Sequence, residues 1–273
     1  MTITAHCLVK NEARFVWFAV MSVIDYVDKV LLWDTGSSDQ TPEIIKTIKR
    51  AGPTKIDFKE VGEVDPAGFM KIRQEMLEAT NTDWFIVVDG DEIWWNDSIK
   101  KVVDAINNKD STIESVVVPT INLLGDIYHY QEEKAGRYHL AGRNGHLNLR
   151  GVNRHIPGLK SDKPHGSWGW VDEEDKMIQY RDPQKVFFVD APYLHATHLP
   201  RSLARTGDIL VPKRAHKLKY EIGIEFPRDF YYPEVLFKAR PAIVSSPWPK
   251  MDLSYKAKAL WQTPLKKIKR RLI

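Results

Sequence analysis

Short apolar runs alternate with amphipathic segments through the first half of the chain. The runs at 3–9, 29–33, 56–61, 83–88 and 115–123 predict strands, and the segments 12–26, 68–79 and 99–106 predict helices. The run at 83–88 is apolar on both faces, which is typical of a strand in the middle of a helix-covered sheet. This alternation predicts an α/β fold with a mainly parallel central sheet flanked by helices.

Two polar residues mark where helices of the first half begin. Asn11 is a favourable N-cap for the helix at 12–26. Thr41 and Pro42 predict a second helix, with Thr41 as the N-cap and Pro42 at the first helical position, where a missing N–H costs nothing.

After residue 124 the pattern becomes irregular. Residues 125–185 are rich in Gly, His, Arg, Asn and Trp, and we expect loops and short strands over one edge of the sheet. Strands are predicted again at 185–189 and 193–197, and helices at 201–209 and 213–222.

Composition narrows the class of protein and its compartment. With 273 residues, 43% of them hydrophobic, the chain can bury a full core. The single cysteine, Cys7, excludes an intrachain disulfide and indicates a reducing compartment. No apolar run approaches the roughly 20 residues of a spanning helix, and the N-terminus lacks the pattern of a signal peptide. We therefore expect a cytoplasmic protein.

Three carboxylates follow the apolar run at 83–88 within four positions. If the backbone stays extended, Asp89 and Asp91 project to one face and Glu92 to the other, with Gly90 allowing close approach of a ligand. Two carboxylates aimed at one point need a proton or a cation between them, and hard oxygen ligands suit Mg²⁺ or Mn²⁺. The alternative is an acidic turn that caps the next helix.

Two further polar clusters, at 10–12 and 34–39, also follow predicted strands. In an open parallel sheet, ligands bind beyond the carboxyl ends of the strands, so neighbouring strands would bring all three clusters to one site. The chain has neither GxGxxG nor GxxxxGK[ST], so phosphate binding here would need the ion.

The run VKNEARFVWFAVMSVIDYVDKVLLWDTGSSDQTPEII resembles the opening of family 2 glycosyltransferases with the GT-A fold. The resemblance lies in the branch that starts with KNE and carries DTGSxDxT at the second strand. DGDE at 89–92 is similar to the DxD motif of that family, and DPAGFMKIRQEML at 65–77 resembles its arginine-bearing stretch. The likeness is specific over residues 3–95.

The resemblance implies a nucleotide-diphosphate sugar donor, with a UDP-sugar favoured, and Mn²⁺ or Mg²⁺ as cofactor. Asp34 would contact the base, Lys10 and Arg73 the nucleotide or its phosphates, Asp89 the ribose or metal side, and Asp91 the ion. The full set of expected nucleotide-sugar residues is Lys10, Asn11, Glu12, Asp34, Gly36, Arg73 and Asp89. A bound ion neutralises the departing diphosphate.

An inverting transfer also needs a base for the acceptor hydroxyl. The dense acidic cluster in VDEEDK matches the place of a V-H-E element in related enzymes, with Asp in place of His. Glu173 is the favoured base, with Asp172 and Asp175 as substitutes; a solvated acidic turn is the alternative.

GT-A enzymes often place a late histidine on the metal or the diphosphate, so the resemblance makes the late histidines of this chain candidates for that role. His195 and His198 flank a predicted strand end, and His198 is favoured because Pro200 and Arg201 mark a loop. His165 is a weaker candidate. A spacing of three also fits two surface histidines.

The resemblance divides the chain into a nucleotide-sugar-binding half (1–124), an acceptor-side half of the same domain (125–222) and a C-terminal extension (223–273). The expected function is metal-dependent sugar transfer to a glycan or lipid-linked acceptor in cell-surface polysaccharide synthesis. Two alternatives are a sugar-nucleotide-binding or membrane-scaffold subunit that lost the base, and a phosphatase of the haloacid dehalogenase type. The phosphatase would place its DxD after the first strand, whereas this motif follows the fourth.

The net charge of +4 belongs to the C-terminal end. Residues 254–273 hold seven basic residues and no acid, and the remainder of the chain is net acidic, which argues against nucleic-acid binding. Thr263 and Pro264 predict a helix start, and Leu265, Ile268 and Leu272 share one face. A basic amphipathic helix at 264–273 would lie on the inner face of an anionic membrane. A solvated terminus is the alternative.

Overall fold

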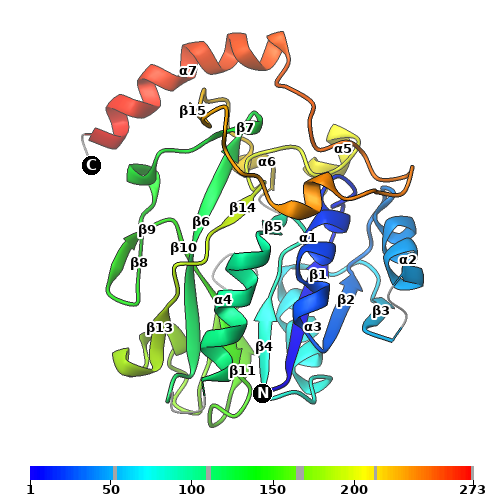
Figure 1. The fold of residues 1–273 in the computed structure, drawn as a ribbon, viewed down its shortest axis with the longest axis vertical. Coiled ribbons are helices and arrows are strands. Elements are labelled where there is room, and N and C mark those ends of the chain that lie inside the picture. Colours follow the sequence, from blue (N-terminus) through cyan, green and yellow to red (C-terminus); the bar gives the residue numbers. More distant parts are fainter. Residues whose placement is uncertain (52–53, 109–111, 164–168, 212–213, 272–273) are drawn as a thin grey trace.

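A curled central sheet organises the protein in the computed structural model (Figure 1). The structure describes residues 1–51, 54–108, 112–163, 169–211 and 214–271. The main path of the sheet runs β15-β7-β6-β10-β4-β1-β2-β3, with β13, β14 and β5 attached beside it. Its strands are β1 (Ile3–Val9), β2 (Lys29–Asp34), β3 (Ile56–Glu60), β4 (Trp84–Val87), β5 (Glu92–Trp94), β6 (Ser115–Leu124), β7 (Asp126–Tyr130), β10 (Leu147–Asn153), β13 (Val186–Phe188), β14 (Tyr193–His195) and β15 (Ile224–Glu225).

Helices and two small sheets complete the fold. The α-helices are α1 (Val16–Val23), α2 (Thr41–Ala51), α3 (Pro66–Glu78), α4 (Asn96–Asn107), α5 (Arg205–Ile209), α6 (Arg214–Lys217) and α7 (Leu253–Arg271). The short 3-10 helices are η1 (Ile24–Tyr26), η2 (Glu133–Ala135), η3 (Ile178–Tyr180), η4 (Pro183–Lys185) and η5 (Glu234–Phe237). The small sheets pair β8 (Tyr138–Leu140) with β9 (Arg143–Gly145), and β11 (Lys160–Asp162) with β12 (Gly169–Val171).

The sheet changes from parallel to antiparallel across β10. Strands β4, β1, β2 and β3 are all parallel, so their carboxyl ends share one edge. Strand β10 then pairs antiparallel with both β4 and β6. The expected α/β class with a mainly parallel, helix-flanked sheet is confirmed. The same sheet contains strands from both sides of residue 124, because β10 lies between β4 and β6.

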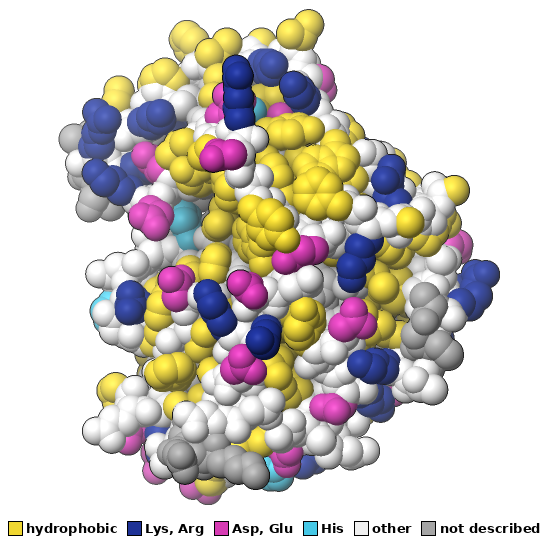
Figure 2. Space-filling view, viewed as in Figure 1, with side chains coloured by type: hydrophobic (Ala, Val, Ile, Leu, Met, Phe, Trp, Pro, Cys, Tyr) yellow, Lys and Arg dark blue, Asp and Glu magenta, His cyan; other side chains and the backbone are white. Residues whose placement is uncertain are grey.

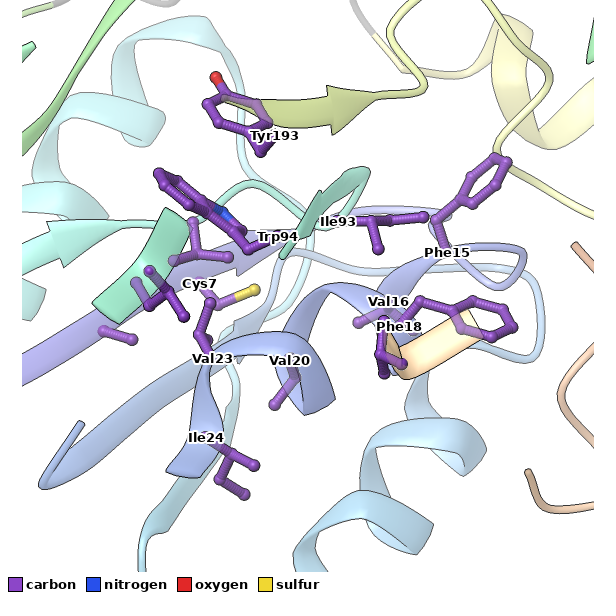
Figure 3. Close-up of a cluster of buried hydrophobic side chains, with 14 of the residues drawn as sticks. Cys7, Phe15, Val16, Phe18, Val20, Val23, Ile24, Ile93, Trp94 and Tyr193 are labelled. Carbon is purple, nitrogen blue, oxygen red and sulfur yellow. The ribbon is translucent and has the colours of Figure 1, made fainter. Parts of the chain in front are cut away.

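Side chains of β1 alternate between the two faces of the sheet. Cys7 is buried and packs against α1. Figure 3 shows Cys7 of β1 near Val23 of α1 and Trp94 of β5 in this cluster, which also includes side chains of α2 and α4. On the other face, Leu8 packs against α3. Helices on both faces explain why the strands are apolar throughout.

The first helix begins later than predicted. We expected it over 12–26 with Asn11 as N-cap, but α1 starts at Val16, and Ile24–Tyr26 tighten into the 3-10 turn η1. Asn11 has a φ of 53° and is therefore not in the conformation of a helix N-cap. The amides of Phe15 and Val16 both bond to the carbonyl of Glu12 instead. The KNE segment is thus a loop at the end of β1.

The C-terminal helix begins earlier than predicted. We took Thr263 and Pro264 for its start, but α7 begins at Leu253, with the Asp252 side chain accepting from the Tyr255 amide at 2.6 Å. Pro264 lies inside the helix, where the Thr263 hydroxyl bonds to the carbonyl of Ala259 at 2.6 Å. Within the described parts of the chain, no helix combines the length and apolar character that crossing a bilayer requires.

Candidate active site

A cavity of about 720 Å³ opens at the carboxyl ends of β1, β2 and β4. We call the part that is lined by residues from the ends of these strands and from α3 the donor half. The acceptor half is lined by residues of 120–148 and by Lys219. The segment 195–217 lies between the two halves. The predicted residues that line the cavity are Lys10, Glu12, Arg73, Asp89, Asp91, His195 and His198.

Asn11 joins the loop after β1 to two other loops. Its Oδ1 accepts a hydrogen bond from the Ser38 amide at 2.7 Å, and its Nδ2 donates to the Gly207 carbonyl at 2.8 Å. Asn11 is fully buried and is not among the described residues that line the cavity. Its side chain holds the loop after β1 against the loops of Ser38 and Gly207.

Asp34 shapes the loop that follows β2. Its Oδ2 accepts from the amides of Gly36 at 3.1 Å and Ser37 at 2.9 Å. Gly36 has a φ of 78°, and a Cβ there would lie 2.9 Å from the backbone nitrogen of Glu63. Burial raises the pKa of Asp34, against these hydrogen bonds. Thr35, between the two, is the residue of this loop that lines the cavity.

The carboxylates of DGDE are arranged differently from the prediction. Strand β4 ends at Val87, and the chain turns so that the Glu92 amide bonds to the Asp89 carbonyl at 3.1 Å. The extended backbone that would set Glu92 apart is therefore absent from this described segment. Glu92 instead shares the Arg150 guanidinium with Asp89, whose Oδ2 lies 3.2 Å from Arg150 Nη2.

Arginines supply the positive charge around Asp89 and Glu92. Arg73 Nη2 lies 3.4 Å from Asp89 Oδ1. Burial raises the pKa of Asp89, but Arg150 and Arg73 outweigh this effect and hold the pKa below its usual value. Burial prevails at Glu92, which is fully buried, and raises its pKa to about 7 despite Arg150. Repulsion among these acids is relieved by the protein itself, before any ligand binds.

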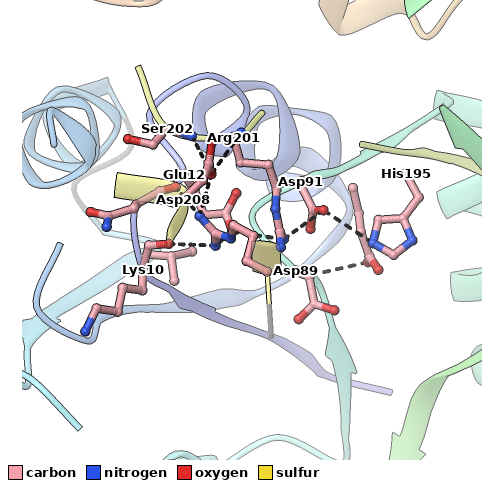
Figure 4. Close-up of polar contacts among 12 residues, drawn as sticks. Lys10, Glu12, Asp89, Asp91, His195, Arg201, Ser202 and Asp208 are labelled. Atoms are coloured by element: carbon pink, nitrogen blue, oxygen red, sulfur yellow. Dashed lines mark hydrogen bonds and ion pairs between the residues drawn. The ribbon is translucent and has the colours of Figure 1, made fainter. Parts of the chain in front are cut away.

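Asp91 faces a second group of cations (Figure 4). Its Oδ2 lies 2.9 Å from Arg201 Nη1 and 3.4 Å from His195 Nε2. Against the effect of burial, Arg201 and His195 hold the pKa of Asp91 well below its usual range. Asp91 is 1% exposed, and neither of its oxygens accepts a geometrically sound hydrogen bond from the described residues. Its carboxylate is therefore ionised and still able to take a further donor or ion.

Glu12 and Lys10 complete the donor half. Glu12 Oε1 lies 3.1 Å from Arg201 Nη1 and also contacts Arg214 Nη2. Burial raises the pKa of Glu12 to about 8, against both arginines. The Lys10 ammonium lies 3.1 Å from the exposed Glu63 carboxylate. Lys10 and Glu12 thus reach the cavity from one loop.

Sequence reasoning missed Arg150, Arg201 and Arg214 as site residues. Arg150 lies in β10, within the irregular region 125–185, whereas Arg201 lies in the loop after β14 and Arg214 in α6, in segments that were predicted to be helical. The available signal was indirect: buried carboxylates need cationic partners, and the acids of the first hundred residues have too few nearby in sequence.

The two late histidines have different surroundings. His195 faces Asp91, as described above. His198 lines the cavity, but its Nδ1 donates to the Lys217 carbonyl at 2.8 Å, and its Nε2 lies 3.1 Å from Lys219 Nζ. Burial, followed by Lys219, lowers the pKa of His198 to about 3, so this ring is neutral. The geometry therefore favours His195, not His198, beside the carboxylates. His165 lies outside the described residues.

The acids predicted to supply the base do not line the described cavity. Asp172 accepts from the amides of Glu174 and Lys176 and is paired with Arg181. Arg181 also binds Glu114, just before β6, which places this turn at the amino end of that strand. Glu173 and Asp175 lie in the same turn, away from the carboxyl ends where the cavity opens.

The protein ligands at this site fit a divalent metal ion that takes its remaining ligands from a bound phosphate and from water. Among the described residues, no group of three or more acids, histidines or cysteines is arranged to hold a metal. Asp91 and His195 offer one carboxylate oxygen and one imidazole nitrogen 3.4 Å apart. Mg²⁺ and Mn²⁺ accept such sparse protein ligation when phosphates and water supply the remaining oxygens.

The sequence profile of "Glycosyl transferase family 2" matches residues 7–163, more than half of the chain. The chain belongs to glycosyl transferase family 2. The family assignment agrees with the resemblance seen in the KNE, DTGSSDQT and DGDE motifs, and it leaves the phosphatase alternative without support. This family 2 chain is also 33% identical over 85 residues to a TPR repeat-containing protein of Synechococcus elongatus. That match covers 31% of this chain and 19% of the curated relative.

Solved structures with similar folds are distant from the family 2 chain. S. aureus TarS 1-349 shares 12% identity with a TM-score of 0.45, covering 80% of this chain and 68% of that one. Glucosyl-3-phosphoglycerate synthase of Mycobacterium tuberculosis, in complex with Mn²⁺, UDP and glucosyl-3-phosphoglycerate, shares 14% identity with a TM-score of 0.45 and 71% coverage of both chains. The mannosyltransferase PcManGT of Pyrobaculum calidifontis, with GDP-Man and Mn²⁺, shares 18% identity with a TM-score of 0.39, covering 56% and 45%.

Proposed function

We propose that this family 2 protein is a glycosyltransferase that takes its sugar from a nucleotide-diphosphate sugar, with a UDP-sugar favoured. The observation that carries the proposal is the meeting of the KNE, DTGSSD and DGDE loops at one cavity beyond the carboxyl ends of parallel strands. Ligands of open α/β sheets bind at this edge. The cavity has room for a nucleotide and a sugar together.

The donor's diphosphate is proposed to lie among the cations of the donor half. Lys10 and Arg73 line the cavity there, and Arg201 lines it between the two halves. Phosphate oxygens are strong acceptors for such donors. Asp34 and Gly36 hold the loop that presents Thr35, so their expected role in binding the base acts through the shape of this loop.

A divalent ion, Mn²⁺ or Mg²⁺, is proposed to be held by Asp91 and His195. When bound, such an ion supplies positive charge that stabilises the departing diphosphate. Arg201 already contacts Asp91, so it neutralises this carboxylate when no ion is bound. Asp89 stays ionised between Arg73 and Arg150, on the side proposed for the ribose.

The acceptor is proposed to be a glycan or a lipid-linked glycan of cell-surface polysaccharide synthesis. The inverting course, which needs a base, gains no support from Glu173, Asp172 or Asp175 because the structure leaves them away from the cavity. Among the described residues that line the acceptor half, none is a carboxylate that could take this role. A sugar-nucleotide-binding subunit without transfer activity therefore remains the second candidate.

Thermal stabilisation by donors tests the proposed function. We expect at least one UDP- or GDP-sugar to raise the melting temperature in the presence of Mn²⁺, because a ligand that binds only the folded state stabilises it. Release of nucleoside diphosphate on addition of acceptor glycans then separates a transferase from a binding subunit. If every nucleotide-sugar leaves the melting temperature unchanged, the proposal is wrong.

The proposed membrane contact of the C-terminal end involves α7 from Leu253 onward, and not only residues 264–273. Exposed apolar side chains project from one side of the helix, and Trp261 is 78% exposed. They are Leu253, Leu260, Trp261, Leu265 and Ile268. In Figure 2, hydrophobic and basic side chains mingle along the upper edge of the molecule, where Figure 1 places α7.

The opposite side of α7 fixes the helix to the protein. The Tyr255 hydroxyl donates to the Lys219 carbonyl at 2.6 Å, the Thr263 hydroxyl accepts from the Ile222 amide at 2.8 Å, and Arg270 pairs with Glu221 at 2.6 Å. The apolar side chains are therefore held outward, among exposed lysines and without an acid in the helix. This arrangement fits an anionic lipid surface.

Liposome pelleting tests the lipid contact. We expect binding to vesicles that contain phosphatidylserine, loss of binding for Trp261→Ser, and unchanged binding for Lys100→Gln in α4, on another part of the surface. Equal pelleting of wild type and Trp261→Ser would contradict the contact.

A further inference from the structure

Charge is divided unevenly between the two halves of the cavity. The four acids that line it, Glu12, Asp65, Asp89 and Asp91, all belong to the donor half. The described residues that line the acceptor half include no carboxylate, but they do include Arg137 and Lys219. A neutral sugar would not require such an imbalance, whereas a negatively charged acceptor would be attracted by it.

Lys219 is less exposed to solvent than Arg137. Its Nζ lies 3.1 Å from His198 Nε2, and no described carboxylate lies within ion-pair distance of it. Burial, followed by Lys219, lowers the pKa of His198, so the ring is neutral. Its Nδ1 donates to the Lys217 carbonyl, so its Nε2 accepts from Lys219 and brings no opposite charge. Burial, and then Arg270, lower the pKa of Lys219.

The acids nearest to Lys219 are already neutralised. Arg270 binds Glu221 at 2.6 Å and Glu132 at 2.8 Å. The Lys266 ammonium donates to the Tyr220 carbonyl. A partly buried ammonium whose neighbours are neutral or already paired is unfavourable until an anion joins it.

The wall beside Lys219 offers acceptors for hydroxyl groups. Thr120 Oγ1 and Asn122 Oδ1 are buried without a hydrogen-bond partner among the described residues, and both residues line the cavity. The Asn122 Nδ2 group donates to His146 Nδ1 at 3.0 Å, which fixes the amide with its oxygen left open. Buried polar atoms of this kind are normally satisfied by a ligand or by water.

We propose that the acceptor half binds a sugar that carries a negatively charged group, a phosphate or a carboxylate, with the anion on Lys219 and hydroxyl groups on Thr120 and Asn122. This inference rests on the proposed function, because it names the class of acceptor that the transferase would use. Arg137, at the exposed rim, adds a second cation for the same group.

Calorimetry with simple sugars tests the charge of the acceptor. The protein is first saturated with UDP and Mn²⁺, so that phosphate probes do not report the donor half. Glucose, glucose 6-phosphate and glucuronate are then titrated into wild type, Lys219→Gln, Lys219→Arg and the control Lys100→Gln. The phosphate and carboxylate arms distinguish the two sources of charge.

We expect at least one anionic sugar to bind wild type about tenfold more tightly than glucose, as one charge-assisted hydrogen bond allows. Lys219→Gln should abolish this preference, while Lys219→Arg and Lys100→Gln should keep it. If wild type shows no preference, or if Lys219→Gln retains it, the inference is overturned. Nucleotide binding is an independent readout: if neither UDP nor GDP bound in the presence of Mn²⁺, the proposed function would be overturned, whereas nucleotide binding without anion preference would overturn only this inference.

Discussion

Replacing Arg150 by methionine would isolate the fully buried Glu92 carboxylate. Arg150 is the only described cation paired with Glu92, and its own side chain is 10% exposed. Removing one partner of a buried ion pair costs about 3–5 kcal/mol when the other stays charged. We therefore expect Arg150→Met to lower the free energy of unfolding by this amount at pH values where Glu92 is ionised in the folded protein.

The pH dependence of that loss identifies Glu92 as its source. In wild type the folded pKa of Glu92, about 7, is raised above that of the unfolded chain. Its contribution to stability is thus fully present at low pH and is lost as the pH rises through about 7. Without Arg150 the folded pKa rises further, so the difference between variant and wild type should grow by about 1.4 kcal/mol per pH unit above 7.

Urea unfolding followed by tryptophan fluorescence measures this difference at about pH 6 and about pH 9. Adding Glu92→Gln to Arg150→Met should abolish the growth with pH, because the titrating group is gone. A loss for Arg150→Met below about 1 kcal/mol at the higher pH would refute the reasoning, as would a loss that does not change with pH. Either result would mean that Glu92 is neutral or solvated in the folded protein.

Three further predictions concern stability and local structure. Gly90→Ala should lower the free energy of unfolding by about 1–3 kcal/mol in urea titrations, because the new Cβ would lie 2.9 Å from both Glu12 Cγ and Val9 Cγ1; wild-type stability would contradict this. Glu12→Gln should flatten the decline in stability as the pH rises through about 8, the raised pKa of Glu12, and an unchanged pH profile would contradict it. Thr263→Val, which leaves the Ile222 amide without its acceptor, should speed tryptic cleavage within α7; an unchanged rate would count against the docking.

The strands were predictable because their apolar runs are continuous and bounded by polar residues. The prediction for β1 matches the structure, and β2 differs by one residue. Helix starts were harder because local signals compete with tertiary contacts. Asn11 is a residue type that often caps helices, but its side chain forms hydrogen bonds with two distant loops instead. Pro264 is typical of a helix start, but it lies inside α7.

The site was only partly predictable for a related reason. Acids at strand ends are visible in the sequence, because the strands themselves are. The turn after β4, which gives Asp89 and Glu92 a shared partner, depends on Arg150 from a strand 58 residues further along. The choice between His195 and His198 likewise depends on which ring faces Asp91, and that is set by β14 and not by spacing.

Calorimetric binding of donors is the most direct test of the central claim that the three loops form a nucleotide-sugar site centred on Asp91. Wild type is titrated with UDP- and GDP-sugars in the presence of Mn²⁺, beside Asp91→Ala and the exposed control Asp104→Ala in α4. We predict that at least one donor binds wild type and Asp104→Ala alike, and that Asp91→Ala weakens this binding by about tenfold or more. No binding by wild type, or undiminished binding by Asp91→Ala, would contradict the account.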